Sequence, residues 1–279
     1  MRILITGAGG QLGRELLDVF PGHEVVGLTH AQLDITDPPA VGSAVSAAAP
    51  DVVVHTAAWT AVDLCQDDPQ RAEAVNARGT RHVVEAARAV GARVVYVSTD
   101  YVFDGTKRTP YVEDDETNPL SVYGRTKLAG ERAAADLAGS AIVRTSWVCG
   151  RHGANMVKTI LRLAAEHPRL VFVDDQRGHP TFADDLASMI ATLVEGEHTG
   201  TFHVTNQGAT TWYGFAQAVL GAAGDDPSRV DPITTAEMPR PAPRPANSVL
   251  DNRALREAGL ELLPDHHEPL QRLVDELTA

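Results

Sequence analysis

The sequence contains only two cysteines, Cys65 and Cys149, and so cannot form a disulfide framework. We expect both to be free thiols in a reducing cytoplasm. No apolar run reaches the length that crosses a membrane. The first residues already have the pattern of a buried strand, so no signal peptide is expected either. Together these absences predict a soluble, cytoplasmic protein.

Positive charge is also scarce, because 24 basic residues stand against 37 acidic residues and give a net charge of −13 at pH 7. This balance argues against nucleic acid or an anionic membrane as a partner. Lysine is rarer still and occurs only as Lys107, Lys127 and Lys158. An anionic ligand would therefore have to be held by local arginines and by backbone amides.

A glycine repeat follows the first apolar run. Residues 2–6 have the pattern of a buried parallel strand, and Gly7, Gly10 and Gly13 come next at every third position. Glycines in this arrangement permit a tight turn and a close approach of the backbone to a pyrophosphate, which the N-terminus of the next helix also favours. An ordinary glycine-rich turn could look the same, but the place directly after a strand favours a dinucleotide site.

The pair Tyr123 and Lys127 is the second chemical signal. Residues four apart share one face of a helix. A tyrosine hydroxyl has a pKa of about 10, and an ammonium one turn away favours the phenolate and lowers that pKa. Tyr123 would then be a usable general acid or base. The same spacing also occurs on solvated helix faces, so its weight comes from the glycine repeat earlier in the chain.

Strand and helix patterns alternate through the first half of the chain. Strand-like runs at 2–6, 24–28, 52–55, 93–98 and 141–144 are separated by helical stretches near 11–20, 38–49, 70–90 and 121–138. This alternation predicts an α/β fold of the Rossmann type, with a doubly wound parallel sheet covered on both faces. A ligand should bind beyond the carboxyl ends of the strands.

The pattern becomes irregular after residue 150. Helices are expected at 155–166 and 182–195, Thr211 should cap a helix that begins at Trp212, and short strands are expected at 170–173 and 200–205. The stretches 174–181 and 238–245 should be loops or extended segments because of their glycine and proline content. We therefore predict a dinucleotide-binding domain over residues 1–150, joined by a strand near 200–206, and a smaller, mostly substrate-binding region over residues 151–279.

On these motifs the chain resembles the extended short-chain dehydrogenase/reductases, and within them the dTDP-4-dehydrorhamnose reductase family. The resemblance extends over nearly the whole chain. The glycine and Tyr-Lys motifs are typical of the whole superfamily. The segments typical of the reductase branch are Ser98-Thr99-Asp100-Tyr101-Val102-Phe103, Thr145-Ser146-Trp147 and Arg244-Pro245-Ala246-Asn247-Ser248-Val249-Leu250-Asp251.

The resemblance implies reduction of the 4-keto group of a dTDP-4-keto-6-deoxy-L-hexose, which would turn dTDP-4-dehydrorhamnose into dTDP-L-rhamnose. Tyr123 would protonate the keto oxygen, and Lys127 would hold the cofactor ribose. Thr99 would donate a second hydrogen bond where the charge develops, with Ser98 as its rival. The other substrate-binding residues that the resemblance implies are Asp100, Tyr101 and Trp147 around the sugar and Arg244 and Asn247 near the diphosphate.

The expected cofactor is NADPH, with NADH as the alternative. NAD-preferring Rossmann proteins place an acid at the end of the second strand, but this chain has Thr29 and His30 there. A 2′-phosphate would meet no repulsion from these two side chains. Besides Tyr123 and Lys127, the cofactor-binding residues that we predict are Gly7, Gly10, Gln11, Leu12, Gly13, Thr29, His30, Asp34, Ile35, Ala57, Ala58 and Trp59.

No metal-binding residue is predicted. Reductases of this family are described as using Mg²⁺, but no ligand set for it can be placed in the sequence. The pair His266 and His267 has no companion ligands at a recognised spacing, and we expect both side chains to be exposed to solvent. The expected partner is the dTDP-sugar substrate, and a homodimer is left open.

Other functions fit parts of the pattern. A deoxysugar reductase of secondary metabolism, of the dTDP-dihydrostreptose type, would share all of the motifs. A dehydratase would carry Asp-Glu after the catalytic threonine, where this chain has Asp100 and Tyr101. An epimerase would retain its cofactor tightly through purification. A non-catalytic, regulatory sugar-nucleotide-binding subunit would not need Thr99, Tyr123 and Lys127 intact.

Overall fold

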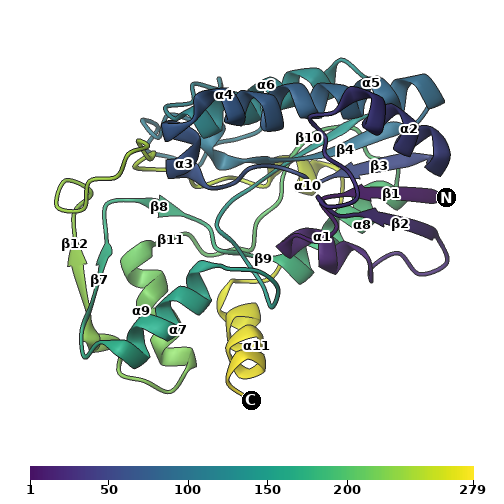
Figure 1. Cartoon of the computed structure of the whole chain (residues 1–279). Helices are drawn as coiled ribbons and strands as arrows, with labels where there is room; N and C mark the ends of the chain where they lie inside the picture. Colours follow the sequence, from purple (N-terminus) through teal and green to yellow (C-terminus); the bar gives the residue numbers. More distant parts are fainter.

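A parallel sheet lies at the centre of the computed structural model, which describes residues 1–279 (Figure 1). Its strand order is β10-β5-β4-β3-β1-β2. All neighbouring strands run parallel, which confirms the predicted Rossmann-type α/β fold. The strands are β1 (Arg2–Thr6), β2 (Glu24–Leu28), β3 (Val52–His55), β4 (Arg93–Thr99), β5 (Ala141–Thr145) and β10 (Gly200–His203).

Helices cover both faces of this sheet, because alternate strand residues point to opposite sides. In β1, Ile3 and Ile5 pack on one face, whereas Leu4 packs on the other. The first face is covered by α1 (Gln11–Leu16), α8 (Ala183–Glu195) and α10 (Arg253–Glu257). The second face is covered by α2 (Pro38–Ala48), α5 (Thr80–Val90) and α6 (Val122–Ala135).

The helical stretch expected at 70–90 consists of three pieces. The short helix α4 (Pro69–Ala72) leads into a π-helical turn, η1 (Glu73–Gly79), and then into α5. The turn carries Asn76, whose side-chain oxygen accepts a hydrogen bond from Trp59 N at 2.8 Å and whose amide donates to Trp59 O at 3.1 Å. Asn76 therefore fixes the chain beyond β3. That segment also forms a short helix, α3 (Val62–Asp67), which the sequence patterns do not predict.

A second, smaller lobe lies beside the sheet and has its own apolar core, formed by Phe182, Phe215, Leu270 and their neighbours. Figure 1 shows its three helices below the layers that cover the sheet. They are α7 (Met156–Glu166), α9 (Trp212–Ala222) and α11 (His267–Thr278). The short strands pair as β6 (Val148–Cys149) with β9 (Thr181–Phe182), β7 (Leu170–Val173) with β12 (Val230–Ile233), and β8 (Arg177–Gly178) with β11 (Thr210–Thr211). Two 3₁₀ turns, η2 (Asp100–Val102) and η3 (Pro227–Arg229), complete the elements.

The chain crosses between the lobes more than once. In the second half, β10 pairs with β5 and α8 packs against α1, so both elements extend the large lobe. The proline-rich run forms no helix and returns to the first half, where Ala242 N donates to Asp63 at 3.2 Å. No helix is both long and apolar enough to cross a membrane.

Two local expectations are corrected by the structure. Helix α1 ends at Leu16 rather than near residue 20, because the backbone tightens into a three-residue bond from Leu17 N to Arg14 O, at 3.2 Å, ahead of Pro21. The stretch 174–181 is not purely a loop, since it contains β8 and the first residue of β9, each paired with another segment.

Candidate active site

Two adjoining cavities lie beyond the carboxyl ends of the large sheet, where a ligand was expected from the strand pattern. One has a volume of about 450 Å³ and the other of about 530 Å³. Both are lined by Gly7, Gly10, Thr56 and Ala58, so they form one continuous groove. The strand order reverses beside β1, which is the place where doubly wound sheets bind dinucleotides.

The glycine turn after β1 forms the floor of this groove. Gly7 has a φ of +73°, and a Cβ there would lie 2.7 Å from Ala57 N. A Cβ on Gly13 would lie 2.2 Å from Gly7 O. Larger residues are therefore excluded, and no side chain caps the N-terminus of α1. The predicted residues Gln11 and Leu12 line the cavity at this helix terminus, where backbone N–H groups suit the phosphates of a dinucleotide.

The larger cavity has the residues predicted for the adenosine end of the cofactor: Thr29, His30, Asp34, Ile35 and Ala57 all line it. The Thr29 hydroxyl donates to Gln32 Oε1 at 2.8 Å. The Asp34 carboxylate accepts hydrogen bonds from Thr36 N at 2.9 Å and Thr36 Oγ1 at 2.7 Å, and these bonds lower the pKa of Asp34. An ionised acid is therefore present in this cavity, although not at the end of β2.

Trp59 differs from the other residues predicted for the cofactor, because it lines neither cavity. Its ring lies under the Arg71 guanidinium at 4.4 Å, and its backbone is held by Asn76. Trp59 thus supports the segment after β3 from outside the groove.

Thr99, Tyr123 and Lys127 all line the smaller cavity. Ser121 caps α6 by accepting a hydrogen bond from Gly124 N at 3.1 Å, so the helix begins directly before Tyr123. Lys127 follows one turn later, as the spacing predicts. Thr99 ends β4 and faces the same space.

The pKa of Tyr123 does not follow the expectation drawn from the Tyr-Lys spacing. Burial raises this pKa, and hydrogen bonding to the Thr99 hydroxyl offsets only part of the rise. The Lys127 ammonium donates to Val97 O at 2.7 Å and lies 4.1 Å from the ring centre of Tyr96. Burial also lowers the pKa of Lys127 to about 7. Desolvation therefore dominates both groups in this structure.

The two rival hydroxyls at the end of β4 have different partners. Ser98 Oγ donates to Glu131 Oε1 at 2.5 Å and is committed to that carboxylate. Thr99 Oγ1 donates to Asp100 Oδ1 at 2.9 Å and accepts from Tyr101 N at 3.2 Å. The second oxygen of Asp100 is buried without a partner, and burial raises the pKa of Asp100 to about 7.

Trp147 forms a wall of the same cavity and is rigidly held. Its backbone has a φ of +46°, which is unusual for a bulky residue. Its indole stacks on Trp212 with ring centres 3.6 Å apart and an interplanar angle of 11°. A Cβ on Gly178 would lie 2.7 Å from the same indole, so only glycine fits beneath it. The flat aromatic surface suits a deoxysugar face.

Three other residues predicted for the substrate lie outside the groove. Arg244 forms a two-pronged ion pair with Asp63, at 2.7 and 3.0 Å. Asn247 donates to Lys107 O at 2.8 Å. Tyr101 packs edge-to-face against Tyr123 with ring centres 5.9 Å apart. None of the three lines the cavity that contains Thr99.

Several lining residues are missing from the sequence prediction. Thr56, Thr60 and Ser146 follow β3 and β5, so their position after a buried strand is a signal that could have found them. Gly153 and Ala154 lie in the loop before α7 and carry no comparable pattern. Their place at the cavity depends on how the lobes meet.

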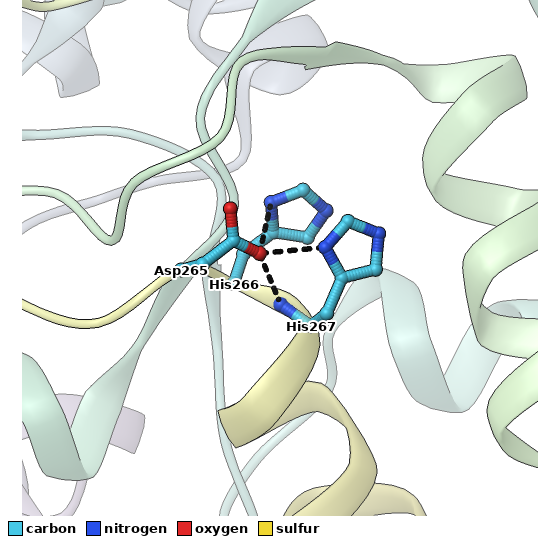
Figure 2. Close-up of side chains that lie close together, drawn as sticks. All are labelled: Asp265, His266 and His267. Carbon is cyan, nitrogen blue, oxygen red and sulfur yellow. Dashed lines mark hydrogen bonds and ion pairs between the residues drawn. The ribbon is translucent and has the colours of Figure 1, made fainter.

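Asp265, His266 and His267 form a cluster at the start of α11, as Figure 2 shows. The Asp265 carboxylate accepts hydrogen bonds from His267 N at 3.1 Å and His267 Nδ1 at 2.6 Å. The imidazoles stack 4.1 Å apart, so their in-plane lone pairs do not converge on one point. His266 is buried, contrary to expectation, because it packs on Phe215 and contacts Gln207 O at 3.1 Å. Two imidazoles and one carboxylate also do not match the oxygen ligands that Mg²⁺ prefers.

Comparison with known proteins agrees with this geometry. The family model described as RmlD substrate binding domain matches residues 1–279. A dTDP-4-dehydrorhamnose reductase from Streptomyces griseus is 47% identical over 271 residues, covering 94% of this chain and 89% of the relative. A crystal structure of a dTDP-4-dehydrorhamnose reductase from Clostridium acetobutylicum is 42% identical with a TM-score of 0.96 and covers 100% of both chains.

A second crystal structure, of dTDP-4-dehydrorhamnose reductase from Bacillus anthracis in complex with NADP, is 38% identical with a TM-score of 0.95 and covers 99% of both chains. Sequence identity of this order over nearly the full length extends well beyond the glycine and Tyr-Lys motifs. The chain therefore belongs to the dTDP-4-dehydrorhamnose reductase family.

Proposed function

We propose that this chain uses NADPH to reduce the 4-keto group of dTDP-4-dehydrorhamnose. The observation that carries the proposal is that Thr99, Tyr123 and Lys127 line the same cavity as the glycine turn. A proton donor, a hydrogen-bond donor and an ammonium thus lie in the space that continues from a dinucleotide cradle. In this proposal residues 1–150 with β10 hold the cofactor, and most of 151–279 shapes the sugar site.

The proton chemistry falls to residues of this chain. When bound, the reduced nicotinamide supplies a hydride to the keto carbon. Tyr123 gives its phenolic proton to the keto oxygen as negative charge grows there, and its raised pKa keeps that proton in place at neutral pH. Lys127 supplies positive charge one turn away and donates toward the cofactor ribose.

Thr99 stabilises the developing charge through its one hydroxyl proton. In the structure that proton goes to Asp100. With a pKa of about 7, Asp100 is partly protonated at neutral pH, and its carboxyl can then donate to Thr99 instead. When Asp100 donates in this way, the Thr99 hydroxyl is free to donate its own hydrogen bond to the keto oxygen. A hydrogen bond there stabilises the negative charge that develops in the transition state.

Two observations bear on the choice between NADPH and NADH, and they point in opposite directions. Thr29 and His30 at the end of β2 carry no negative charge that would repel a 2′-phosphate, and a relative in this family binds NADP. Asp34, in the same cavity, carries a negative charge. We infer that NADPH is used at least as well as NADH, because the acid follows β2 by several residues. Comparing kcat/KM for the two cofactors tests this inference, and a tenfold preference for NADH would overturn it.

The sugar is proposed to lie against Trp147, with Asp100 beside its reacting end. Arg244 would reach the diphosphate only by sharing or leaving Asp63, and Asn247 would act through the segment that it anchors. Binding of the diphosphate would thus depend on the contacts that fix the proline-rich run against the first half of the chain.

The direct test is NADPH oxidation by the purified chain in the presence of dTDP-4-dehydrorhamnose, with product identification. Matched reactions contain the free 4-keto sugar, or the nucleotide-linked 4-keto sugar of opposite configuration at C3 and C5. We expect turnover with the first substrate and far less with the other two. Equal turnover of the free sugar would remove the nucleotide-sugar assignment, and faster turnover of the epimer would favour a different deoxysugar. No NADPH oxidation with any of them would remove the reductase assignment.

A further inference from the structure

Helix α6 lies unusually close to β4, at the height of the catalytic residues. Two glycines of α6 make this possible. A Cβ on Gly130 would lie 2.4 Å from the Tyr96 hydroxyl oxygen, and a Cβ on Gly124 would lie 2.1 Å from Tyr101 O. The helix therefore approaches the strand closely enough for its side chains to bond directly to the strand and its immediate continuation.

Two α6 side chains, one turn apart, hold two consecutive residues of β4. Lys127 Nζ donates to Val97 O at 2.7 Å, and Glu131 Oε1 accepts from Ser98 Oγ at 2.5 Å. The next residue of β4 is Thr99. The helix positions 123, 127 and 131 thus present the acid, the ammonium and a carboxylate along one face.

Glu131 is itself fixed from a third element. Arg144 of β5 donates to Glu131 through Nε at 3.0 Å and through Nη2 at 2.8 Å. Arg144 Nη1 also donates to Glu113 O at 3.2 Å. Glu131 is 3% exposed and Arg144 is 6% exposed. A buried ion pair of this kind adds little net stability compared with apolar side chains of similar volume, so its presence calls for another reason.

We propose that Glu131 is a positioning residue for the reaction: it holds the end of β4 so that the Thr99 hydroxyl stays in place beside Tyr123, and it supplies a negative charge one helical turn from Lys127. The inference rests on the proposed reductase function. Glu131 does not line the cavity, whereas Ser98, Thr99 and Lys127 do, so it acts only through these neighbours.

The second role of Glu131 is to favour the protonated, positively charged form of Lys127. Burial lowers the pKa of Lys127 to about 7, and the Glu131 carboxylate opposes that shift. Among the other groups near Lys127, His55 has a pKa of about 3 and is neutral, and burial raises the pKa of both Tyr96 and Tyr123. Asp100 is partly protonated, and Arg144 is paired with Glu131. Glu131 is thus the charged neighbour that favours protonated Lys127.

Two variants separate the two tasks. Ser98→Ala removes the bond between strand and carboxylate but keeps the Glu131–Arg144 pair. Glu131→Gln keeps the shape and removes the charge. We expect both to lower kcat by about tenfold or more, because misplacing a catalytic group by a fraction of an ångström is costly, while KM for the sugar nucleotide stays within about twofold. In addition, Glu131→Gln should move the alkaline limb of the pH profile down by about one pH unit, and Ser98→Ala should not.

The matched control is Ser140→Ala. Ser140 is also a buried serine next to the large sheet, and its hydroxyl accepts a hydrogen bond from Val94 N at 3.3 Å, at the opposite end of β4. It should lower the melting temperature as much as Ser98→Ala and leave kcat unchanged. If Ser98→Ala behaves in the same way as this control, Glu131 has no positioning role through the strand.

A readout without turnover keeps this test independent of the proposed substrate. The dissociation constant of NADPH, measured by fluorescence from pH 5.5 to 9, should increase as Lys127 loses its proton, and Glu131→Gln should shift that increase to lower pH. An unchanged binding profile in a folded Glu131→Gln protein would overturn the electrostatic half of the inference. If Glu131→Gln does not fold, Ser98→Ala decides the positioning half. Absence of turnover in the wild type, with the binding shift present, would instead remove the proposed function alone.

Discussion

The two sides of the groove that we propose for the cofactor and for the substrate are built in different ways. On the cofactor side, the contacts that exclude larger residues join backbone atoms: the Cβ positions of Gly7 and Gly13 point at Ala57 N and Gly7 O. On the substrate side, the wall depends on side-chain pairs. Trp147 in the wall lies on Trp212, and Arg244, outside the cavity, is bound to Asp63 across 181 positions of the chain.

This difference determines how each side responds to change. A backbone cradle tolerates no added atom but needs little from distant residues. A wall of side chains can be altered at one residue while the lobe keeps its fold, because Trp147 and Trp212 pack against the core around Phe215 and Leu270 only from its partly exposed edge. We therefore expect mutations on the cofactor side to affect all substrates alike, and mutations on the substrate side to change the choice of sugar.

The largest expected effect lies between the two sides, at Tyr123. Tyr123→Phe removes the proton donor and almost no volume, so kcat should fall by about 10²- to 10⁴-fold. NADPH should bind within about twofold of the wild-type affinity, because neither side of the groove is disturbed. Steady-state kinetics and a binding titration measure the two quantities. A variant with near-normal kcat at pH 7 would show that another group supplies the proton.

Gly13→Ala breaks the cofactor side. Its added Cβ would lie 2.2 Å from Gly7 O, so α1 must shift away from the turn. Overpacking of this kind costs on the order of 1–3 kcal/mol, so the NADPH dissociation constant should rise on the order of 10- to 100-fold. Titration with NADPH measures the change. The comparison of the two sides would fail if cofactor affinity were preserved and only the sugar KM rose.

Trp147→Ala breaks the substrate side. The sugar loses an aromatic surface, so its KM should rise by about tenfold and kcat should fall, with cofactor affinity unchanged. Trp212→Ala offers a graded control, because it removes the support behind Trp147 without touching the cavity itself, and should have a smaller effect of the same kind. Loss of NADPH binding in either variant would place the indole pair on the wrong side of the groove.

The pH dependence sharpens the comparison, because two groups at the junction have pKa values near 7. Lys127 has a pKa lowered to about 7 and loses its charge as pH rises, and Asp100 has a pKa raised to about 7 and gains charge over the same range. Both changes disfavour reduction, so kcat/KM should fall above neutrality by about tenfold per pH unit if one of the two protonations is required, and by up to about a hundredfold per pH unit if both are. The pH profiles of two variants show which group causes the fall above neutrality. Lys127→Arg stays protonated and Asp100→Asn stays neutral, so the fall should disappear in the variant whose group is responsible. A limb unchanged in both variants would belong to another group.

The smallest effect is expected at Arg244. If Arg244 meets the diphosphate, Arg244→Ala should raise the substrate KM several-fold with little change in kcat, because the diphosphate is bound equally in ground and transition states. Asp63→Asn separates this role from a purely structural one. It frees the guanidinium, so KM should stay the same or fall. An equal rise in KM for both variants would mean that the ion pair matters only for holding the proline-rich run.

Most residues that line the groove around the glycine turn could be predicted from the sequence because their signals are local. Gly7 follows a buried strand directly, and Tyr123 and Lys127 are one helical turn apart. Arg244 and Asn247 were expected at the substrate, but the structure gives them partners far away in the sequence, Asp63 and Lys107. No periodicity encodes such pairs. The lowered pKa of Lys127 was also not predictable, because it depends on burial rather than on the spacing of residues.

The pair Trp147 and Trp212 has an optical consequence as well. The chain contains three tryptophans, and two of them are this stacked pair at the cavity wall. Rings 3.6 Å apart share their excited states, so absorption and circular dichroism in the aromatic region depend strongly on their separation. One indole lies in the bend between β5 and β6, where the chain leaves the large sheet, and the other begins α9 of the small lobe. Any movement of this bend against α9 would therefore change a spectrum that the protein carries without an added label.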